Sequence, residues 1–433
     1  MIPERLSALD ASFLANESQL APMHVGWVAS FDPPEHGPAP TAEELASHIG
    51  ARLDGAHRYR QRLAEVPLGV HDPVWIDDPG FDPARHVHAV GELDVDGELS
   101  TPLARDRPLW EMWVADDLTL LGKAHHCMVD GLAVVELGNL LLDADPDAGA
   151  GGGKAWAAQP APTPGQRLGR AIADRIGETA SLLTSPLRLA ANVRALPATA
   201  RMATHTLLPP APGSPLNARG SGQRRHVRVT RTVDEVRRIR KRFGVTPNDV
   251  VLAACAGALH LYLDEPQPLK VMVPADVRSA DDSAIGNRIS FVFHPLPCDE
   301  PDGVRRLQAI HRVSSQRRRD GDAGQLDAAF RLLALTPGPV QRTLAHAFAH
   351  PRLYNLTISS VPGPAVTRYL RGCRLRTVHS AVPLAEHHAL SIGVVTVAGN
   401  VCFGITCDPA TFPDPERLAA NIDTALDELL DDA

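Results

Sequence analysis

Cysteine is scarce in this chain, and the few cysteines form no pattern. The six cysteines are scattered along 433 residues without a C-x-x-C pair. Zinc-binding modules and disulfide-stapled domains need cysteines at regular, mostly short spacings, so neither class is indicated. We expect reduced thiols and a cytoplasmic protein. The cysteines are Cys127, Cys255, Cys298, Cys373, Cys402 and Cys407.

Long apolar segments are also missing. No apolar run reaches the roughly 18 residues that a transmembrane helix needs. Residues 1–5 lack the basic segment and the apolar core of a secretory signal. From the sequence we therefore expect neither secretion nor a membrane span.

The chain has no excess of positive charge. Its 43 basic and 51 acidic residues give a net charge of -8, whereas nucleic-acid binding needs a basic face. A content of 44% hydrophobic and 22% charged residues is typical of folded globular proteins. The length allows two or three domains, each with its own core. We expect no nucleic acid among the partners.

Two common catalytic signatures are absent. The sequence contains no G-x-S-x-G segment, which a serine hydrolase would carry. A glycine run ends at Lys154 and superficially resembles a phosphate-binding loop, but Ala148 stands where its first glycine belongs and Ala155 follows the lysine. Neither a serine nucleophile nor a phosphate-binding loop is indicated.

The most informative stretch covers residues 118–142. An apolar segment leads into His125 and His126, Asp130 and Gly131 follow, and leucines and valines then recur at helical spacing. This order predicts a strand, a turn and a helix. Adjacent strand residues point to opposite faces, so we expect only one of the two histidines to face a substrate.

The chemistry of these residues suits proton transfer. Histidine has an ordinary pKa near ~6.5, which suits a general base. Asp130 is expected to lie behind the ring or to pair with a distant arginine, and Gly131 permits the turn. A buried histidine pair or half of a metal site are the alternatives.

A second candidate lies at the start of a helix after residue 245. Thr246 is a suitable N-cap, Pro247 suits the first helical position, and Asp249 lies in the first turn. Asn248 is thereby placed at the helix mouth, where an amide donor can stabilise an oxyanion. The alternative is a helix start with no catalytic role.

Residues 144–215 differ from the rest in composition. Glycine, alanine and proline dominate 148–165, which marks the end of a packed unit. Residues 166–205 then have a helical pattern in which arginines far outnumber the two acidic residues, Asp174 and Glu178. Such a segment is either a basic amphipathic crossover on a lipid surface or a linker packed on the two lobes.

The histidine motif resembles a known signature. His125-His126-x-x-x-Asp130-Gly131 resembles the HHxxxDG motif of CoA-dependent acyltransferases related to chloramphenicol acetyltransferase and to peptide-synthetase condensation domains. More closely, the chain resembles the bacterial wax ester synthase/acyl-CoA:diacylglycerol acyltransferase family. Each match is weak alone, while their order is specific. The matching segments are 6–14, 22–26, 107–111, 245–251, 286–290 and 359–364.

The resemblance implies a fold and a division of the chain. The implied fold class is α/β (α+β), with two chloramphenicol-acetyltransferase-like lobes. Each lobe is a mixed sheet flanked by helices, and an active-site channel lies between them. Residues 1–143 would form the lobe with HHxxxDG, 144–215 the crossover linker, and 216–433 the lobe with the Asn-Asp helix start.

The family resemblance also implies an O-acyltransferase that moves a fatty acyl group from acyl-CoA to a fatty alcohol or diacylglycerol. His126 would be the general base, without a covalent intermediate, a bound cofactor or a metal. Contact with the inner membrane or lipid inclusions fits such substrates. The catalytic set is His126, His125, Asp130, Gly131 and Asn248. The supporting residues are Arg278, or else Arg288, as partner of Asp130, with Trp110 and Asp249. The expected channel residues are Pro108, Leu109, Ser359 and Ser360.

Two further hypotheses remain. Residues 94–102 are short and contain glycine where the family is expected to have a helix, which could open one channel wall to a hydroxyl or amine of a specialised metabolite. The second hypothesis is a non-catalytic binding module with the same fold. The presence of His126, Asp130 and Asn248 counts against it. A second pair, His387 and His388, lacks the Asp-Gly partner and is predicted to lie at the surface or along the channel.

Overall fold

The computed structural model describes residues 4–129, 138–148, 156–184, 208–276, 289–322, 324, 343 and 345–433. Several predictions concern other residues: those for Asp130, Gly131, Arg278 and Arg288 lie outside the described part of the chain.

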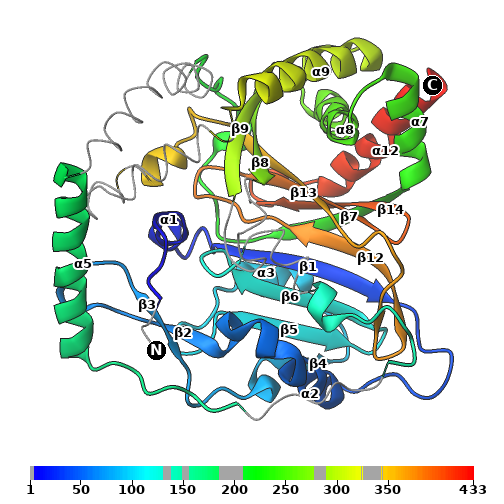
Figure 1. Cartoon of the computed structure of the whole chain (residues 1–433). Coiled ribbons are helices and arrows are strands. Elements are labelled where there is room, and N and C mark those ends of the chain that lie inside the picture. The colour runs from blue at the N-terminus through cyan, green and yellow to red at the C-terminus, as the bar shows by residue number, and fades with distance from the viewer. Residues whose placement is uncertain are drawn as a thin grey trace.

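Two six-stranded sheets form the centre of the molecule (Figure 1). The first has the order β11-β12-β1-β6-β5-β4 and the second the order β7-β14-β13-β10-β8-β9. The strands of the first sheet are β1 (His24–Phe31), β4 (Val87–Val90), β5 (Trp110–Ala115), β6 (Thr119–His125), β11 (Tyr369–Leu370) and β12 (Cys373–Ala381). Those of the second are β7 (Arg225–Thr232), β8 (Leu269–Asp276), β9 (Ile289–Leu296), β10 (Leu356–Pro362), β13 (Leu390–Val397) and β14 (Asn400–Cys407). A separate pair joins β2 (Gln61–Ala64) and β3 (Val74–Asp77).

The helices cover these sheets. In Figure 1, α8, α9 and α12 gather over the second sheet, and α5 stands along one edge of the molecule. The described helices are α1 (Ala8–Asn16), α2 (Ala42–Arg52), α3 (Val95–Ser100), α5 (Pro164–Thr184), α7 (Val233–Phe243), α8 (Pro247–Tyr262), α9 (Gly303–Asp320) and α12 (Pro415–Asp431). The mixed α/β class with two lobes is confirmed.

Helix starts follow the capping chemistry of the sequence. The Thr41 hydroxyl accepts the amide of Glu44, whose carboxylate accepts the amide of Thr41 at 2.8 Å. Thr246 and Asp249 make the same reciprocal pair at the start of α8. The predicted N-cap Thr246 is confirmed. Both caps stabilise their helices, because each satisfies amides that have no partner inside the helix.

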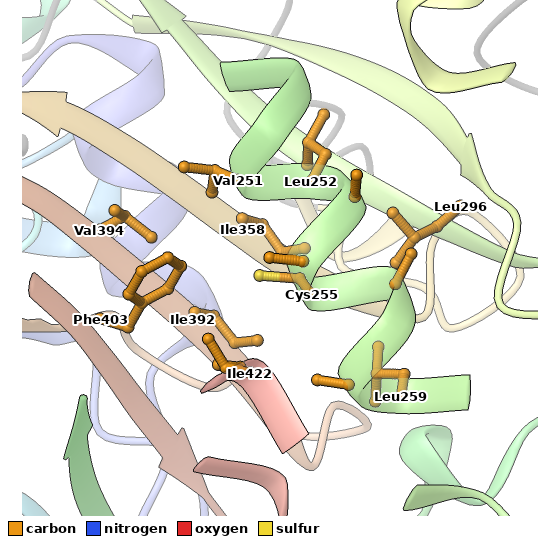
Figure 2. Packing of buried hydrophobic residues seen from close by; sticks show 14 of the residues in the cluster. Val251, Leu252, Cys255, Leu259, Leu296, Ile358, Ile392, Val394, Phe403 and Ile422 are labelled. Atoms are coloured by element: carbon orange, nitrogen blue, oxygen red, sulfur yellow. The ribbon is translucent and has the colours of Figure 1, made fainter. Parts of the chain in front are cut away.

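Helix α8 is the centre of the second lobe. Every residue from Asp249 to Leu259 is buried. Figure 2 shows Val251, Cys255 and Leu259 packed among side chains of the second sheet and of α12. A helix that is apolar on all sides must be covered on all sides. This packing fixes the direction in which the N-terminal end of α8 points.

Part of the C-terminal half belongs to the first sheet. Strand β12 pairs with β1, with Ala381 opposite Gly26 and Val378 opposite Ala29. The same strand packs on β13 and β14 of the second sheet. The predicted boundary at residue 216 therefore does not separate the two sheets, because one segment of residues 369–381 crosses back.

Most of residues 94–102 form helix α3 (Val95–Ser100). The Asp94 side chain accepts the amide of Gly97 at 2.9 Å and begins α3. Glycine fits here because a Cβ atom at residue 97 would lie 2.1 Å from an Asp94 carboxylate oxygen. The expectation that this helix is missing and opens a channel wall is wrong. The glycine that suggested a loop is what permits the cap.

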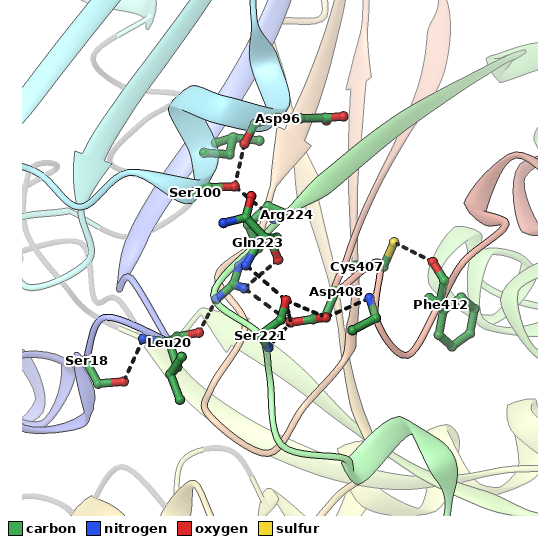
Figure 3. Close-up of polar contacts among 12 residues, drawn as sticks. Ser18, Leu20, Asp96, Ser100, Ser221, Gln223, Arg224, Cys407, Asp408 and Phe412 are labelled. Carbon is green, nitrogen blue, oxygen red and sulfur yellow. Dashed lines mark hydrogen bonds and ion pairs between the residues drawn. The ribbon is translucent and has the colours of Figure 1, made fainter.

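The lobes are joined by a buried polar contact. Arg224 donates from its backbone amide to Ser100 Oγ and from its guanidinium to the Leu20 carbonyl, both at 2.9 Å (Figure 3). The guanidinium also lies 3.8 Å from the Asp408 carboxylate. Asp408 in turn accepts hydrogen bonds from Ser221 Oγ at 2.9 Å. Arg224, directly before β7, thus connects the second lobe with the end of α3 and with the loop at Leu20.

Helix α5 lies within the crossover predicted for residues 144–215. Arg167 and Arg175 donate to the backbone oxygens of Glu65 and Val70, and Asp174 binds Arg5 at 2.6 Å. The outer side carries the exposed side chains of Ile172 and Ile176. No helix in the described part of the chain is both long and apolar enough to cross a bilayer.

Candidate active site

The two histidines lie where β6 ends. The His125 amide donates to the Leu109 carbonyl and the His126 amide to the Met23 carbonyl, at 2.9 and 2.8 Å. Position 125 is opposite His24 on β1. The sheet therefore fixes the backbone on which both rings stand.

The His125 ring is buried and held from both sides. Its Nδ1 accepts the backbone amide of Cys127 at 3.0 Å, and its Nε2 lies 3.1 Å from Glu17 Oε1. Because Nδ1 is an acceptor in this contact, the ring proton is on Nε2 and is donated to the carboxylate. The side chain is only 1% exposed, so His125 fixes the turn.

Glu17 was not found from the sequence. This residue caps the C-terminal end of α1 and binds both His125 and Arg105. Burial raises the pKa of its carboxyl, but the hydrogen bond from His125 and the neighbouring positive charge of Arg105 outweigh this and lower the pKa to about 2. Glu17 is therefore ionised at neutral pH. No spacing rule connects residues 17 and 125.

The His126 ring is the one that faces open space. It stacks on the Phe13 ring of α1, with centroids 3.8 Å apart and planes 9° apart. His126 also lines a large cavity. Helix α1 thus contacts both histidines, through Phe13 and through Glu17 at its end.

The cavity has a volume of about 440 Å³ and mostly apolar walls. Its lining comes from α1, β1, α2 and β12 on one side and from β8, β9, β10 and residues 345–349 on the other. Ser359 and Ser360 contribute to it. The cavity therefore lies between the lobes and accommodates apolar ligands beside His126.

Three other predicted residues are buried outside this lining. Trp110 donates from Nε1 to the Tyr59 carbonyl at 2.8 Å and stacks on His86 at 4.5 Å. Pro108 and Leu109 are also buried, and neither is among the described residues that line the cavity. All three form the packing beneath the histidine strand.

Asn248 lies in the first turn of α8 and is partly buried. In the described part of the chain it is not among the cavity-lining residues. Its neighbour Asp249 is fully buried and accepts hydrogen bonds from His311 Nδ1, at 2.8 Å, and from Ser314 Oγ. Burial raises the pKa of Asp249, but the hydrogen bonds from His311, Ser314 and Thr246 outweigh it, and the pKa is lowered.

The second histidine pair has two different environments. His387 is exposed, whereas His388 is buried, stacks on Tyr354 at 4.0 Å and lies 3.2 Å from the Tyr354 carbonyl through Nε2. The prediction of a surface or channel position is therefore wrong for His388, which is part of the core of the second lobe. Among the described residues, no group of three or more His, Cys, Asp and Glu side chains is placed to hold a metal ion.

Two lobes around an apolar cavity, with the second histidine of an HHxxxDG motif in its wall, define the class of two-lobed, chloramphenicol-acetyltransferase-like acyltransferases. Residues 6–251 match the family model of the wax ester synthase/diacylglycerol acyltransferase catalytic domain, and residues 285–430 match that of the C-terminal domain. The chain belongs to this family and is an acyltransferase.

Known proteins agree with this assignment. A Mycobacterium tuberculosis protein provisionally named a diacylglycerol O-acyltransferase is 31% identical, over 99% of this chain and 90% of its own length. The wax ester synthase/diacylglycerol acyltransferase from Marinobacter aquaeolei VT8 has the same fold, with a TM-score of 0.70, 23% identity and 98% coverage of each chain.

More distant structures share the two-lobed fold. The starter condensation domain of rhizomide synthetase, solved with C8-CoA and Leu-SNAC, aligns with a TM-score of 0.61 and 14% identity. The alignment covers 99% of this chain and 94% of that one. The resemblance inferred from the sequence is confirmed.

Proposed function

We propose that this enzyme transfers a fatty acyl group from acyl-CoA to the hydroxyl of a fatty alcohol or a diacylglycerol, forming a wax ester or a triacylglycerol and free CoA. The observation that carries the proposal is the position of His126, in the wall of a largely apolar cavity of about 440 Å³. The names of the relatives support the same substrates.

In this reaction His126 accepts the proton of the acceptor hydroxyl. The oxygen attacks the thioester carbonyl, and a C–O bond forms as the carbonyl electrons move to oxygen. When the tetrahedral intermediate collapses, the C–S bond breaks and the proton on His126 passes to the CoA sulfur. No covalent acyl-enzyme is formed in this sequence, and the base returns to its neutral form.

The surroundings of His126 support this role. The stacked ring of Phe13 restricts rotation of the imidazole, and the buried pair of His125 and Glu17 fixes the turn that carries it. A base held in one orientation loses less entropy when the hydroxyl arrives. Apolar walls exclude water that would otherwise compete as acceptor.

Further roles follow from the sequence motifs. We propose that Asn248 supplies an amide donor to the developing oxyanion, that Asp130 pairs with Arg278, and that Gly131 permits the turn. The position of Asn248 in the first turn of α8 supports a donor role, because helix N-termini stabilise negative charge. Acyl-CoA is a co-substrate, and the proposal includes no bound cofactor.

We also propose that the enzyme is cytoplasmic and contacts a lipid surface through α5. Ile172 and Ile176 are exposed on its outer side, and Leu68 is exposed in a turn that packs on this helix. Exposed apolar side chains on an arginine-containing helix are typical of helices that lie in the membrane interface. Replacing Ile172 and Ile176 by serine should then reduce sedimentation with phosphatidylglycerol vesicles.

The direct test uses purified protein with palmitoyl-CoA and either hexadecanol or dioleoylglycerol. Thiol release and ester formation should both depend on the acceptor, and His126→Ala should abolish them while circular dichroism stays unchanged. Thiol release that neither lipid increases, but that an added polar alcohol or amine does increase, would instead favour a specialised-metabolite acceptor. The reason for this alternative acceptor was the expectation that residues 94–102 lack a helix. The structure has helix α3 there, so that reason no longer applies. Absence of release with every acceptor would favour a binding module.

A further inference from the structure

The cavity continues beyond His126 along one strand. Val25, Trp27, Ala29 and Phe31 all line it. These alternate residues share one face of β1, because successive strand side chains point to opposite sides. Since His24 is paired with His125, the strand leads away from the catalytic turn. We call this part of the cavity, from Val25 to Phe31, the β1 arm.

The β1 arm has the length of a fatty chain. From Val25 to Phe31 the strand advances six residues at roughly 3.3 Å each, or about 20 Å. One leaflet of a bilayer, half of a hydrocarbon core of roughly 30 Å, is about 15 Å deep and is filled by ordinary fatty chains. A long aliphatic chain therefore fits in the arm in extended form.

The walls of the arm suit methylene groups. Leu45 and Ile49 of α2, together with Leu141, lie in the same apolar cluster as Ala29 and Phe31, and all of them line the cavity. None of these side chains carries a charge or a hydrogen-bonding group. Such a surface accepts a hydrocarbon and excludes a CoA nucleotide.

Ala29 is the smallest side chain in its row. Strand pairing places Leu120 of β6 on one side of it and Val378 of β12 on the other, and both line the cavity. Directly paired side chains point to the same face of a sheet, so the alanine leaves a gap between two larger residues. A bulkier residue at position 29 would close the arm between Trp27 and its far end.

The Trp27 side chain does not block the arm, because its indole ring packs over a glycine on the neighbouring strand. Gly122 is paired with Trp27, and a Cβ atom at residue 122 would lie 2.3 Å from the indole ring. The indole therefore occupies the space that any other residue at 122 would fill. Without this glycine the ring would have to move.

A second group of apolar residues lines the same cavity in the other lobe. Met272 on β8, Phe291 on β9 and Phe348 contribute there. Two apolar regions, one in each lobe, thus adjoin one histidine. The reaction proposed above joins two lipid substrates at that histidine.

We propose that the β1 arm holds the aliphatic chain of one substrate with its reacting end at His126, and that Ala29 determines the chain length accepted. This inference rests on the proposed acyl transfer. The chain is that of the acyl donor or of the alcohol acceptor, which share the same hydrocarbon chemistry.

The test compares chain lengths in an Ala29→Phe variant. One series varies the donor, hexanoyl-CoA against palmitoyl-CoA, with hexanol as acceptor. The other varies the acceptor, hexanol against hexadecanol, with hexanoyl-CoA as donor. We expect the ratio of kcat/KM for the long over the short chain to fall more than about tenfold in one series, since pocket shape discriminates chains by this order. The affected series identifies the bound chain.

Two further variants and a control complete the test. Ala29→Leu should shift the same ratio in the same direction by less, which keeps the test valid if the phenylalanine prevents folding. Phe31→Ala should shift preference towards chains longer than palmitoyl. Ala89→Phe adds the same group at an exposed position of β4 and should leave both ratios unchanged.

Unchanged ratios in both series for folded Ala29→Phe and Ala29→Leu would overturn the inference. A wild-type protein that is inactive with every chain would refute the proposed reaction instead. In that case palmitate binding by isothermal titration calorimetry decides. Binding weakened about tenfold or more by Ala29→Phe supports the arm, and equal binding refutes it.

Discussion

Among single residues, the adjacent histidines differ in what surrounds them. His125 is enclosed by the amide of Cys127 and the carboxylate of Glu17, whereas His126 lies between Phe13 and the cavity. Alternation along a strand predicts that the two rings diverge. It does not predict that Glu17 would hold one of them.

Replacing Glu17 by glutamine tests this contact. The variant keeps the shape but loses the charge that binds His125 and Arg105. Hydrogen bonds to charged groups contribute about 1.5–3 kcal/mol, so we expect a loss of that order in the free energy of unfolding. Since Glu17 acts through His125, kcat should fall about tenfold with KM nearly unchanged, a difference of about 1.4 kcal/mol in the barrier.

Urea unfolding and steady-state kinetics measure both effects. Glu92→Gln, at an exposed position, is the control and should change neither quantity. If Glu17→Gln matched the control in stability and in kcat, the carboxylate would have no positioning role.

At the level of elements, α3 illustrates how one glycine decides a local structure. The Asp94 cap needs the space at residue 97, and the carbonyls of Glu98 and Thr101 then accept hydrogen bonds from the buried Lys123 Nζ, both at 2.9 Å. Lys123 lies two residues before the histidine pair. The helix therefore supports the strand that carries the site.

Gly97→Ala should destabilise the protein. Its Cβ would meet the Asp94 carboxylate and displace the cap, and the loss of an N-cap costs about 1 kcal/mol. The midpoint of thermal unfolding should fall accordingly. Gly91→Ala is the matched control, because its Cβ would meet Asp116 at an ordinary 3.9 Å. Equal midpoints for the two variants would contradict the role of the cap.

On the scale of the whole molecule, the two lobes depend on contacts far apart in the sequence. Strand β12 returns from the second lobe to pair with β1, and Arg224 connects the second sheet to Leu20 and Ser100. The site lies at this junction. Whatever loosens the junction should also disturb the cavity.

Arg224→Met tests the junction. The substitution leaves the buried carboxylate of Asp408 without its neighbouring cation, and breaking a buried pair in this way costs about 3–5 kcal/mol. Arg225→Met is the control, since Arg225 is exposed and its ion pairs with Asp96 and Glu416 are worth about 1 kcal/mol or less. Denaturant unfolding should show a larger loss in the free energy of unfolding for Arg224→Met than for Arg225→Met. Equal losses in the two variants would contradict this account.

Buried histidines should make the fold sensitive to acid. Burial is the largest cause that lowers the pKa of each, to about 3 or about 4, below the ordinary value of roughly 6.5. The unfolded chain then binds protons that the folded chain does not. Stability is therefore fully present above roughly pH 6.5 and is lost as pH falls towards the folded pKa values. These histidines are His24, His226, His294, His379 and His388.

Each such histidine contributes up to about 1.4 kcal/mol per pH unit in that window. Glu17, with its pKa lowered to about 2, adds a further loss below roughly pH 4.5. Urea unfolding at a series of pH values from about 7.5 down to about 4.5 should show the free energy of unfolding falling with pH. His379→Asn should make this pH dependence less steep, whereas His36→Asn, at an exposed position, should leave it unchanged. Constant stability across this range would contradict the burial argument.

The sequence by itself determined the local features. The N-caps of Thr41 and Thr246, the strand that ends at His125 and the alternation along β1 depend on contacts within a few residues, and such contacts follow spacing rules. The motifs also identified the family, because their order survives where single residues vary.

Only the tertiary structure decided which distant residues meet. Nothing in the spacing of residues 17 and 125, or of 29 and 378, says that they are neighbours. Strand pairing and cavity shape depend on how whole elements pack, and the free energy of that packing is distributed over many side chains. The cavity beside His126 and the carboxylate behind His125 are products of that packing.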